Sequence, residues 1–458
     1  MKPEGGRFSR GFKAALLETM VKTPAAEPVA RVAGVEGGGR FDTSFETLPA
    51  YQQFRTQHAV ADALQLNFPF YREHEAMAGA RSVIGGQAVV NFASYDYLGL
   101  NGHPAITEAV IAATRQWGTS VSASRITAGE RAFHRQLERA LADVYEAEDA
   151  LVFVSGHATA ISTVAALLGP KDLILHDGLI HNCVVVGAQL SGATRRPFPH
   201  NDLDALDAML ASTRERFERV MIITEGLFSM DGDGPDLARL VAIKQRWDCW
   251  LMVDEAHSIG VLGATGRGIA EQDGVDPRLV DIWLGTLSKT LVSCGGYVAG
   301  SRKLIDYLKL AAPGMVYSVG MPAPAAMAAL TAIEIMRREP ERVARLQANG
   351  QLFLRLARAA GLDVGTSAGY AVTPVIIGDS LRTVLLAERL LKRGINAFPI
   401  VPPGVPEKSA RLRFFISSEH TGAEIEAAVA ATAEEVAGVE REGVSLGTLA
   451  KLMMKRGA

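Results

Sequence analysis

Short apolar runs alternate with helical patterns through the middle of the chain. Each run is too short for a helix, and the runs lie at residues 150–154, 173–175, 220–224, 250–253, 282–284 and 297–299. Between them, residues 130–148 place Phe133, Leu137, Leu141 and Val144 on one helical face. This alternation predicts an α/β fold in which helices cover both faces of a mostly parallel sheet. Ligand sites are then expected at the carboxyl ends of the strands.

The pattern changes after about residue 336. The expected elements are a helix at 340–360, a strand at 372–377, a helix at 381–393, strands at 395–400 and 412–416, and a helix from Thr421. We therefore predict a large domain over residues 91–336 and a smaller α+β domain over 337–440. The predicted flanking parts are an N-terminal extension (1–58) that is partly disordered or docks on a partner, a segment that packs on the core (59–90), and a basic tail (441–458).

Composition narrows the functional class. The 458 residues include 48% hydrophobic and 21% charged residues, which excludes a wholly disordered or coiled-coil protein. The net charge is −3, so we expect no nucleic-acid partner. Three cysteines make no disulfide framework, which favours a reducing compartment and hence the cytoplasm. No run of about 18 uncharged apolar residues occurs, so we expect no transmembrane segment.

A carboxylate and a histidine follow the apolar run at residues 250–253. Asp254 stands at the end of this expected strand, and His257 comes three residues later. A carboxylate at the end of a hydrophobic strand is costly unless a cation accompanies it. The letters D-E-A-H also occur in helicase-type ATPases, but those proteins need a G-x-x-x-x-G-K-[ST] phosphate loop, and the sequence has none.

A candidate cation, Lys289, directly follows the next expected strand among small hydroxyl residues. It stands 35 residues after Asp254, and Thr286 and Ser288 lie beside it. Pyridoxal 5′-phosphate (PLP) needs a lysine for covalent attachment, an acid for its ring nitrogen, and donors for its phosphate. A surface lysine after a strand is the plainer interpretation of Lys289 alone. The pair of Lys289 and Asp254 instead predicts a PLP enzyme without a metal.

The wider set of motifs resembles the α-oxoamine synthase family of PLP-dependent enzymes. In the family's order, the matching motifs lie at residues 91–100, 124–125, 129, 155–156, 181, 224–233, 253–258, 266–268, 286–289, 317–318 and 410–414. Each motif is weak alone, whereas the ordered set is specific. The likeness is closest to members associated with polyketide and fatty-acyl assembly. Serine palmitoyltransferase and 8-amino-7-oxononanoate synthase are similar but somewhat more distant.

The resemblance implies a fold and a set of roles. The fold would be that of fold type I PLP-dependent transferases, with a seven-stranded, mostly parallel sheet and a homodimer whose active sites lie at the interface. The implied catalytic residues are Lys289, His181, Asp254 and His257. The implied cofactor contacts also include Ser155, Gly156, His157, Glu225, Thr286 and Ser288, with Ser318 reaching the phosphate from the partner subunit. The implied substrate contacts are Arg413, Tyr95, Ser124, Arg125 and Ser229.

Some positions stay open or depart from the family. Strand alternation puts Arg411 and Arg413 on the same face, so spacing cannot choose between them as the carboxylate-binding arginine. Many members have a glycine-rich run before Ser124, where this chain has T-S-V-S-A, which puts glycine-specific geometry and coenzyme A handling in doubt. Cys183 and its neighbour replace a common Ala-Ser pair after His181.

The implied reaction is the decarboxylative condensation of a small α-amino acid (serine, alanine or glycine) with an acyl thioester. The acyl donor would be an acyl-coenzyme A or an acyl carrier protein, and the product an α-aminoketone. The alternatives are a serine palmitoyltransferase that makes 3-ketosphinganine, an aminotransferase that forms no carbon–carbon bond, and a catalytically dead partner subunit. Lys289, Asp254 and His257 together argue against the last.

Overall fold

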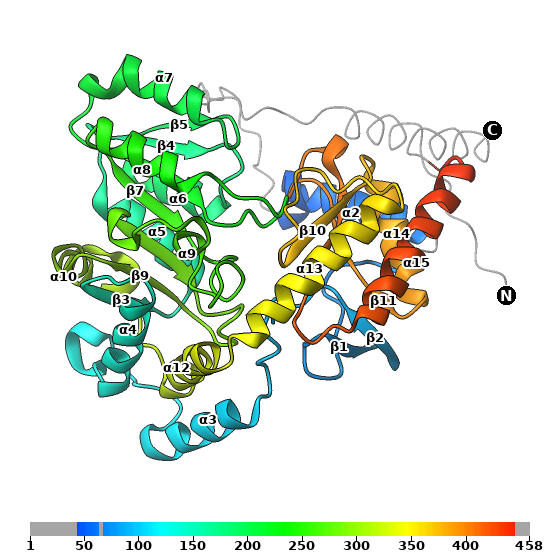
Figure 1. The fold of residues 1–458 in the computed structure, drawn as a ribbon, viewed down its shortest axis with the longest axis horizontal. Helices are drawn as coiled ribbons and strands as arrows, with labels where there is room; N and C mark the ends of the chain where they lie inside the picture. Colours follow the sequence, from blue (N-terminus) through cyan, green and yellow to red (C-terminus); the bar gives the residue numbers. More distant parts are fainter. Residues whose placement is uncertain (1–43, 64–66, 445–458) are drawn as a thin grey trace.

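A seven-stranded sheet forms the centre of the computed structural model, which describes residues 44–63 and 67–444. The strands are β3 (Asp149–Phe153), β4 (Leu173–Asp177), β5 (Thr194–Phe198), β6 (Val220–Glu225), β7 (Trp250–Asp254), β8 (Ile282–Thr286) and β9 (Gly296–Gly300). Their order is β3-β9-β8-β7-β6-β4-β5, and only β9 runs antiparallel to its neighbours (Figure 1). The predicted α/β fold with a mostly parallel sheet is therefore confirmed.

All six strands expected from the apolar runs are present, but β5 was missed. Its sequence is T-R-R-P-F, and only its last residue is buried. The strand lies at the edge of the sheet beside β4. Arginine and proline suit an exposed edge, because they discourage pairing with another chain, and they hide the strand from a search for apolar runs.

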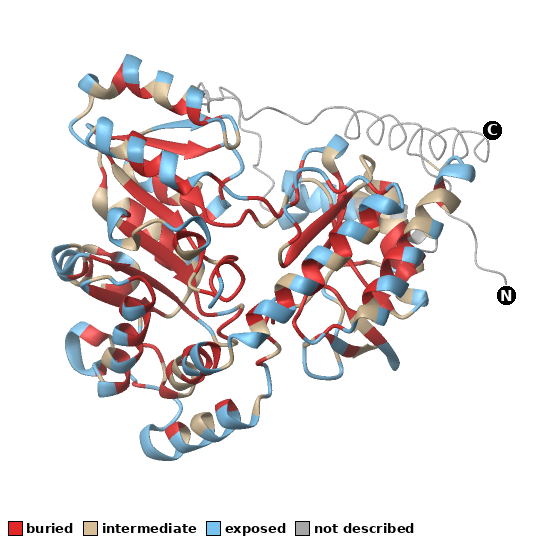
Figure 2. Cartoon of the chain, in the orientation of Figure 1, coloured by how far each residue is buried: buried red, intermediate tan, exposed pale blue. Residues whose placement is uncertain are grey.

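Helices cover both faces of this sheet. They are α3 (Pro104–Trp117), α4 (Ala132–Val144), α5 (Gly156–Leu167), α6 (Asn182–Ser191), α7 (Leu203–Thr213), α8 (Leu237–Arg246), α9 (Ile269–Asp273), α10 (Arg302–Ala311), α11 (Pro313–Val316) and α12 (Ala323–Arg338). Successive residues of β7 enter different cores: Leu251 and Val253 join one hydrophobic cluster, and Met252 joins the other. Figure 2 shows the strands as the most continuously buried part of the chain. The burial on both faces explains why the central strands are continuously apolar.

A second group of elements follows α12. It comprises α13 (Glu341–Ala359), β10 (Val372–Ile376), α14 (Ser380–Lys392), β11 (Ile395–Asn396), β12 (Phe398–Ile400), β13 (Arg411–Phe415) and α15 (Gly422–Arg441). The single strand expected at 395–400 is two strands, because β11 pairs with β2 (Gln87–Asn91) and β12 pairs with β13. The chain changes sheets at Ala397, a contact that the local pattern does not reveal.

Residues ahead of the main sheet also contact this C-terminal group. The hairpin of β1 (Arg81–Ile84) and β2 was not predicted, and it forms a three-stranded sheet with β11. Arg72 and Asn67 both contact the buried carboxylate of Glu388 on α14. The helix α2 (Pro49–Ala63) precedes them. The predicted extension up to residue 43 and the tail beyond 444 lie outside the described residues.

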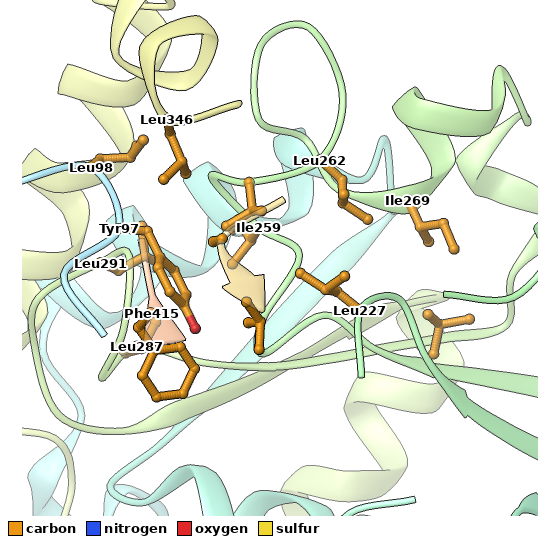
Figure 3. Close-up of a cluster of buried hydrophobic side chains, with 14 of the residues drawn as sticks. Tyr97, Leu98, Leu227, Ile259, Leu262, Ile269, Leu287, Leu291, Leu346 and Phe415 are labelled. Atoms are coloured by element: carbon orange, nitrogen blue, oxygen red, sulfur yellow. The ribbon is translucent and has the colours of Figure 1, made fainter. Parts of the chain in front are cut away.

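Apolar side chains from distant segments meet in one cluster at the junction of the two groups (Figure 3). The labelled members are Tyr97, Leu98, Leu227, Ile259, Leu262, Ile269, Leu287, Leu291, Leu346 and Phe415. They come from the segment after β2, from the loops after β6, β7 and β8, and from α9, α13 and β13. Within the described part of the chain, no helix is long and apolar enough to cross a membrane.

Shortening a side chain in this cluster should destabilise the protein. Ile259 is 1% exposed, so Ile259→Ala is expected to lower the free energy of unfolding by about 2–5 kcal/mol through lost burial and a residual cavity. Leu279→Ala is the matched control, because Leu279 is 37% exposed and should cost about 1 kcal/mol or less. Urea denaturation monitored by circular dichroism measures both, and equal losses would contradict the packing shown here.

Candidate active site

Three neighbouring strands end at the same place and carry polar groups there. Glu225 ends β6, Asp254 ends β7, and the two residues are paired in register. Thr286 ends β8, and Lys289 follows three residues later. A cavity of about 460 Å³ opens at these strand ends. The predicted residues that line it are Tyr95, Ser155, Gly156, His157, His181, Glu225, Ser229, Asp254, His257, Thr286, Ser288, Lys289 and Arg413.

The lysine and the two carboxylates shift one another's pKa values. Burial lowers the pKa of Lys289, although the Asp254 and Glu225 carboxylates oppose the shift. Burial raises the pKa of Asp254, and Lys289 is the main group that opposes it. Burial and the adjacent Asp254 raise the pKa of Glu225 to about 8. A lysine with a lowered pKa spends more time as the neutral amine, which is the form that acts as a base or nucleophile.

His257 lies in a rigid and largely apolar environment. The Tyr97 hydroxyl lies 2.7 Å from His257 Nδ1, and the Phe415 ring stacks parallel to the imidazole with centroids 6.0 Å apart. Burial, followed by the Lys289 charge, lowers the pKa of His257 well below its ordinary value. The Tyr97 hydroxyl and His257 Nδ1 are thus within hydrogen-bonding distance of each other. Sequence reasoning missed this role of Tyr97, although Tyr97 lies within the motif at residues 91–100.

His181 caps the helix α6 at the side of the cavity. Its backbone N–H donates to Glu225 Oε1 at 2.8 Å, and its Nδ1 accepts the backbone N–H of Cys183 at 3.2 Å. The Cys183 sulfur also lies 2.9 Å from Nδ1. Burial lowers the pKa of His181. Because Nδ1 accepts the Cys183 N–H, a neutral ring would carry its proton on Nε2. Cys183 lines the cavity as well, which sequence reasoning noted only as a departure from the family.

Donor groups gather at the N-terminus of α5. Ser155 caps this helix, and Gly156 is its first residue. The Thr286 and Ser288 hydroxyls lie 2.8 Å apart on the facing loop. A Cβ at Gly156 would lie 2.7 Å from Thr286 Oγ1, so a side chain there would crowd the donors. Free backbone N–H groups and hydroxyls at a helix N-terminus suit a phosphate, so these residues fit the phosphate of PLP.

The structure distinguishes the two candidate arginines of β13. Arg411 Nη1 lies 2.7 Å from Asp231 Oδ1, so its charge is already paired. Arg413 lines the cavity, and its Nη1 donates only to the Ser229 carbonyl and the Met230 sulfur. Its Nε is buried without a hydrogen-bond partner, and its guanidinium lies 4.4 Å from the Phe415 ring centroid. Arg413 therefore retains a donor for a carboxylate at the cavity, whereas the charge of Arg411 is already paired with Asp231.

Three predicted residues are not brought to the cavity within one chain. Arg125 is buried and forms ion pairs with Glu130 and Glu138, each at 2.5 Å. Ser124 forms an isolated β-bridge with Val319. Ser318 is adjacent to that bridge and does not line the cavity either. Their expected contacts with substrate or phosphate stay predictions.

Comparison with known proteins identifies the family. The family model for aminotransferase class I and II matches residues 87–431. An 8-amino-7-oxononanoate synthase of Symbiobacterium thermophilum is 39% identical over 79% of this chain and 92% of the relative. A Gloeobacter violaceus protein that carries the same name provisionally is 43% identical, again over 79% and 92%. This chain belongs to the α-oxoamine synthase family.

Solved structures of this family have the same fold. A serine palmitoyltransferase from S. paucimobilis with bound PLP and myriocin superposes with a TM-score of 0.82 at 25% identity, covering 86% of this chain and 99% of the other. The 8-amino-7-oxononanoate synthase from Francisella tularensis gives a TM-score of 0.68 at 25% identity, covering 78% and 99%. The predicted fold type I architecture and PLP cofactor are confirmed, and this α-oxoamine synthase is a PLP-dependent acyltransferase.

The pKa of Glu225 generates a pH-dependent prediction for the cofactor-free protein. A carboxyl whose pKa rises from 4.5 to about 8 on folding stabilises the fold fully below pH 4.5, and this contribution is lost as pH rises through 8. Glu225→Gln stays neutral, so it should lose less stability than the wild type between pH 5 and 9. Urea midpoints at both pH values measure the difference. The exposed Glu108→Gln is the control, and identical pH profiles for Glu225→Gln and wild type would contradict the shift.

Proposed function

We propose that this α-oxoamine synthase condenses a small α-amino acid (serine, alanine or glycine) with an acyl thioester, releasing CO2 and a thiol and forming an α-aminoketone. The observation that carries the proposal is the convergence of Lys289, Asp254 and the unpaired Arg413 donors on one cavity. The proposal also agrees with the names of the relatives.

The chain's own groups divide the work of this reaction. When bound, PLP supplies an electron-withdrawing ring that stabilises negative charge at the substrate's α-carbon. Lys289 would hold the cofactor covalently and then move a proton at the α-carbon. Asp254 would keep the ring nitrogen protonated, and His257 would bind the ring hydroxyl. The Ser155–His157 segment, Thr286 and Ser288 would bind the phosphate.

Arg413 would orient the amino acid by its carboxylate. A planar guanidinium can bind a carboxylate through two parallel hydrogen bonds, which fixes the orientation of the α-carbon. Ser229 and Tyr95 would border the substrate, because both line the cavity beside Arg413. His181, with its Nε2–H free, would lie against the cofactor ring. Holding the breaking bond in one orientation lowers the activation barrier without further chemistry by the protein.

A serine-specific enzyme is the second candidate. The solved structures that superpose with a TM-score of 0.82 are serine palmitoyltransferases, whereas the sequence relatives carry the 8-amino-7-oxononanoate synthase name. This candidate differs from the first only in the amino acid and the acyl chain, so substrate preference distinguishes the two. An aminotransferase would instead release no CO2.

We also infer a homodimer in which a second chain completes each site. Ser318 and Ser124 lie outside the cavity of their own chain, on segments joined by the Ser124–Val319 bridge. Exposed apolar side chains flank this bridge: Tyr317 is 86% exposed and Ile126 is 53% exposed. Such side chains favour burial against another subunit. Ser318 of the partner subunit would then approach the phosphate.

The product mixture tests the proposed reaction. Purified PLP-loaded enzyme is offered serine, alanine or glycine with acyl thioesters of several chain lengths, and CO2, free thiol and α-aminoketone are measured. At least one pair should give all three products in equal amounts, whereas Lys289→Ala should reduce turnover by at least ~10³-fold because the base is lost. Amino-group exchange without CO2 would indicate an aminotransferase. Normal turnover by Lys289→Ala would overturn the assignment.

The N-terminal extension tests the choice of acyl donor. An acyl carrier protein is our proposed donor, and basic residues such as Arg7, Arg10, Lys13 and Lys22 suit an acidic partner. These residues lie outside the described part of the chain. Deleting residues 1–43 should therefore lower kcat/KM with the carrier-bound thioester about fivefold or more, and less with acyl-coenzyme A. Equal losses with the two donors would contradict this role.

A further inference from the structure

A histidine outside the cavity links two segments that contribute residues to it with the chain ahead of β10. His200 follows β5, and its Nδ1 lies 2.8 Å from Asp177 Oδ1, at the end of β4. Its Nε2 lies 3.1 Å from Asp233 Oδ2. The same Asp233 oxygen accepts the Thr366 hydroxyl at 2.6 Å, ahead of β10. We call Asp177, His200, Asp233 and Thr366 the His200 clasp.

One arm of the clasp holds the turn that leads to His181. Asp177 is fully buried, and its Oδ1 also accepts the Leu179 backbone N–H at 2.8 Å. Its Oδ2 accepts the Asn201 N–H, again at 2.8 Å. The carboxylate thus joins the start of the 178–181 turn to the segment after β5. The turn ends at His181, which lines the cavity.

The other arm holds the loop at residues 228–234. The Phe228 N–H donates to the Asp233 carbonyl at 2.8 Å, which closes the loop on itself. The Gly232 carbonyl accepts the Ala368 N–H at 3.0 Å, so the loop also contacts the chain ahead of β10. Gly232 has φ +72°, and a Cβ there would overlap the Val372 carbonyl. The loop is therefore tightly packed against the C-terminal elements.

This loop supplies the groups that orient the arginines of β13. The Ser229 carbonyl accepts Arg413 Nη1 at 3.2 Å, and Asp231 pairs with Arg411. Ser229 and Met230 both line the cavity. A shift of the loop would move the Ser229 carbonyl and the Met230 sulfur, which accept Arg413 Nη1. The Arg413 Nε has no hydrogen-bond partner that would hold the guanidinium in place instead. A displacement of Asp233 would therefore also change the position of the Arg413 guanidinium.

The electrostatics of the clasp favour a charged imidazole. Burial disfavours the charged form, but the Asp177 and Asp233 carboxylates outweigh it and raise the pKa of His200 to about 10. The Phe228 ring lies edge-on at 4.5 Å, and the Asn201 amide nitrogen lies 3.3 Å from Nε2. His200 thus bridges two carboxylates as a cation, and each hydrogen bond is charge-assisted.

We propose that His200 is a positioning residue. It holds the 178–181 turn, the 228–234 loop and the chain ahead of β10 together, so that Arg413 is already oriented for the amino-acid carboxylate. His200 does not line the cavity and takes no part in proton transfer. The inference rests on the proposed function only for its kinetic readout, because the KM for the amino acid is expected to depend on the orientation of Arg413.

The test compares His200→Ala with the wild type in the PLP-loaded full chain. The KM for the amino acid should rise about tenfold, the loss expected for a charge-assisted hydrogen bond, whereas kcat and the KM for the acyl thioester should change less than about threefold. Hydrogen–deuterium exchange should become faster in residues 178–181, 228–234 and 366–372. His103→Ala is the matched control, because His103 caps α3 away from the cavity.

Two milder variants guard against a folding defect. Asp233→Asn keeps the shape but removes one charge, so its KM should rise less than in His200→Ala. Thr366→Val removes only the hydrogen bond from the Thr366 hydroxyl to Asp233, so hydrogen–deuterium exchange should become faster mainly in residues 366–372. Two results would overturn the proposal. One is an unchanged rate of hydrogen–deuterium exchange in all three segments of His200→Ala, and the other is a fall in kcat with an unchanged KM for the amino acid. If the wild type condenses no small amino acid, the proposed function fails, and the exchange rates still decide whether the clasp holds these segments.

Discussion

The burial of Glu225 and Asp254 side by side is the constraint on which the site depends. The two carboxylates are in register at the ends of β6 and β7, and both are buried. Burial makes the ionisation of each carboxyl costly, and the Asp254 charge adds to this cost for Glu225, so the chain needs a nearby cation and a proton to keep both. Lys289 is the nearby cation, and a protonated ring nitrogen of PLP would be a second. The cost of this arrangement is therefore offset by the cofactor that the site binds.

The parallel sheet makes it possible to bury the two carboxylates at the strand ends. The strands β6, β7 and β8 are apolar up to their carboxyl ends because helices cover both faces, and their polar residues stand at those ends. Helix caps and ion pairs then stabilise the loops that follow these strands. The His200 clasp extends this principle to the C-terminal elements, because it joins the ends of β4 and β6 to the chain before β10.

The central strands and most helices were predictable from local pattern. The six continuous apolar runs each became a strand, since burial on both faces leaves a strong signal. The strands that were missed or misdrawn have different causes: β5 is an exposed edge strand, the β1–β2 hairpin is partly exposed, and the buried residues 395–400 divide between two sheets. Their positions depend on partners far along the chain, which a local window does not contain.

The sequence by itself indicated the chemistry: Lys289 and Asp254 predicted a PLP enzyme, and the ordered set of motifs resembled the α-oxoamine synthase family. Only the tertiary structure decided which arginine is free. Arg411 and Arg413 occupy equivalent positions on β13, and Asp231, some 180 residues earlier, pairs with the first alone. It also decided which groups Tyr97 and His200 contact, because their partners are distant in the chain. Reactive groups are local properties of a sequence, whereas their orientation is set by packing between distant segments.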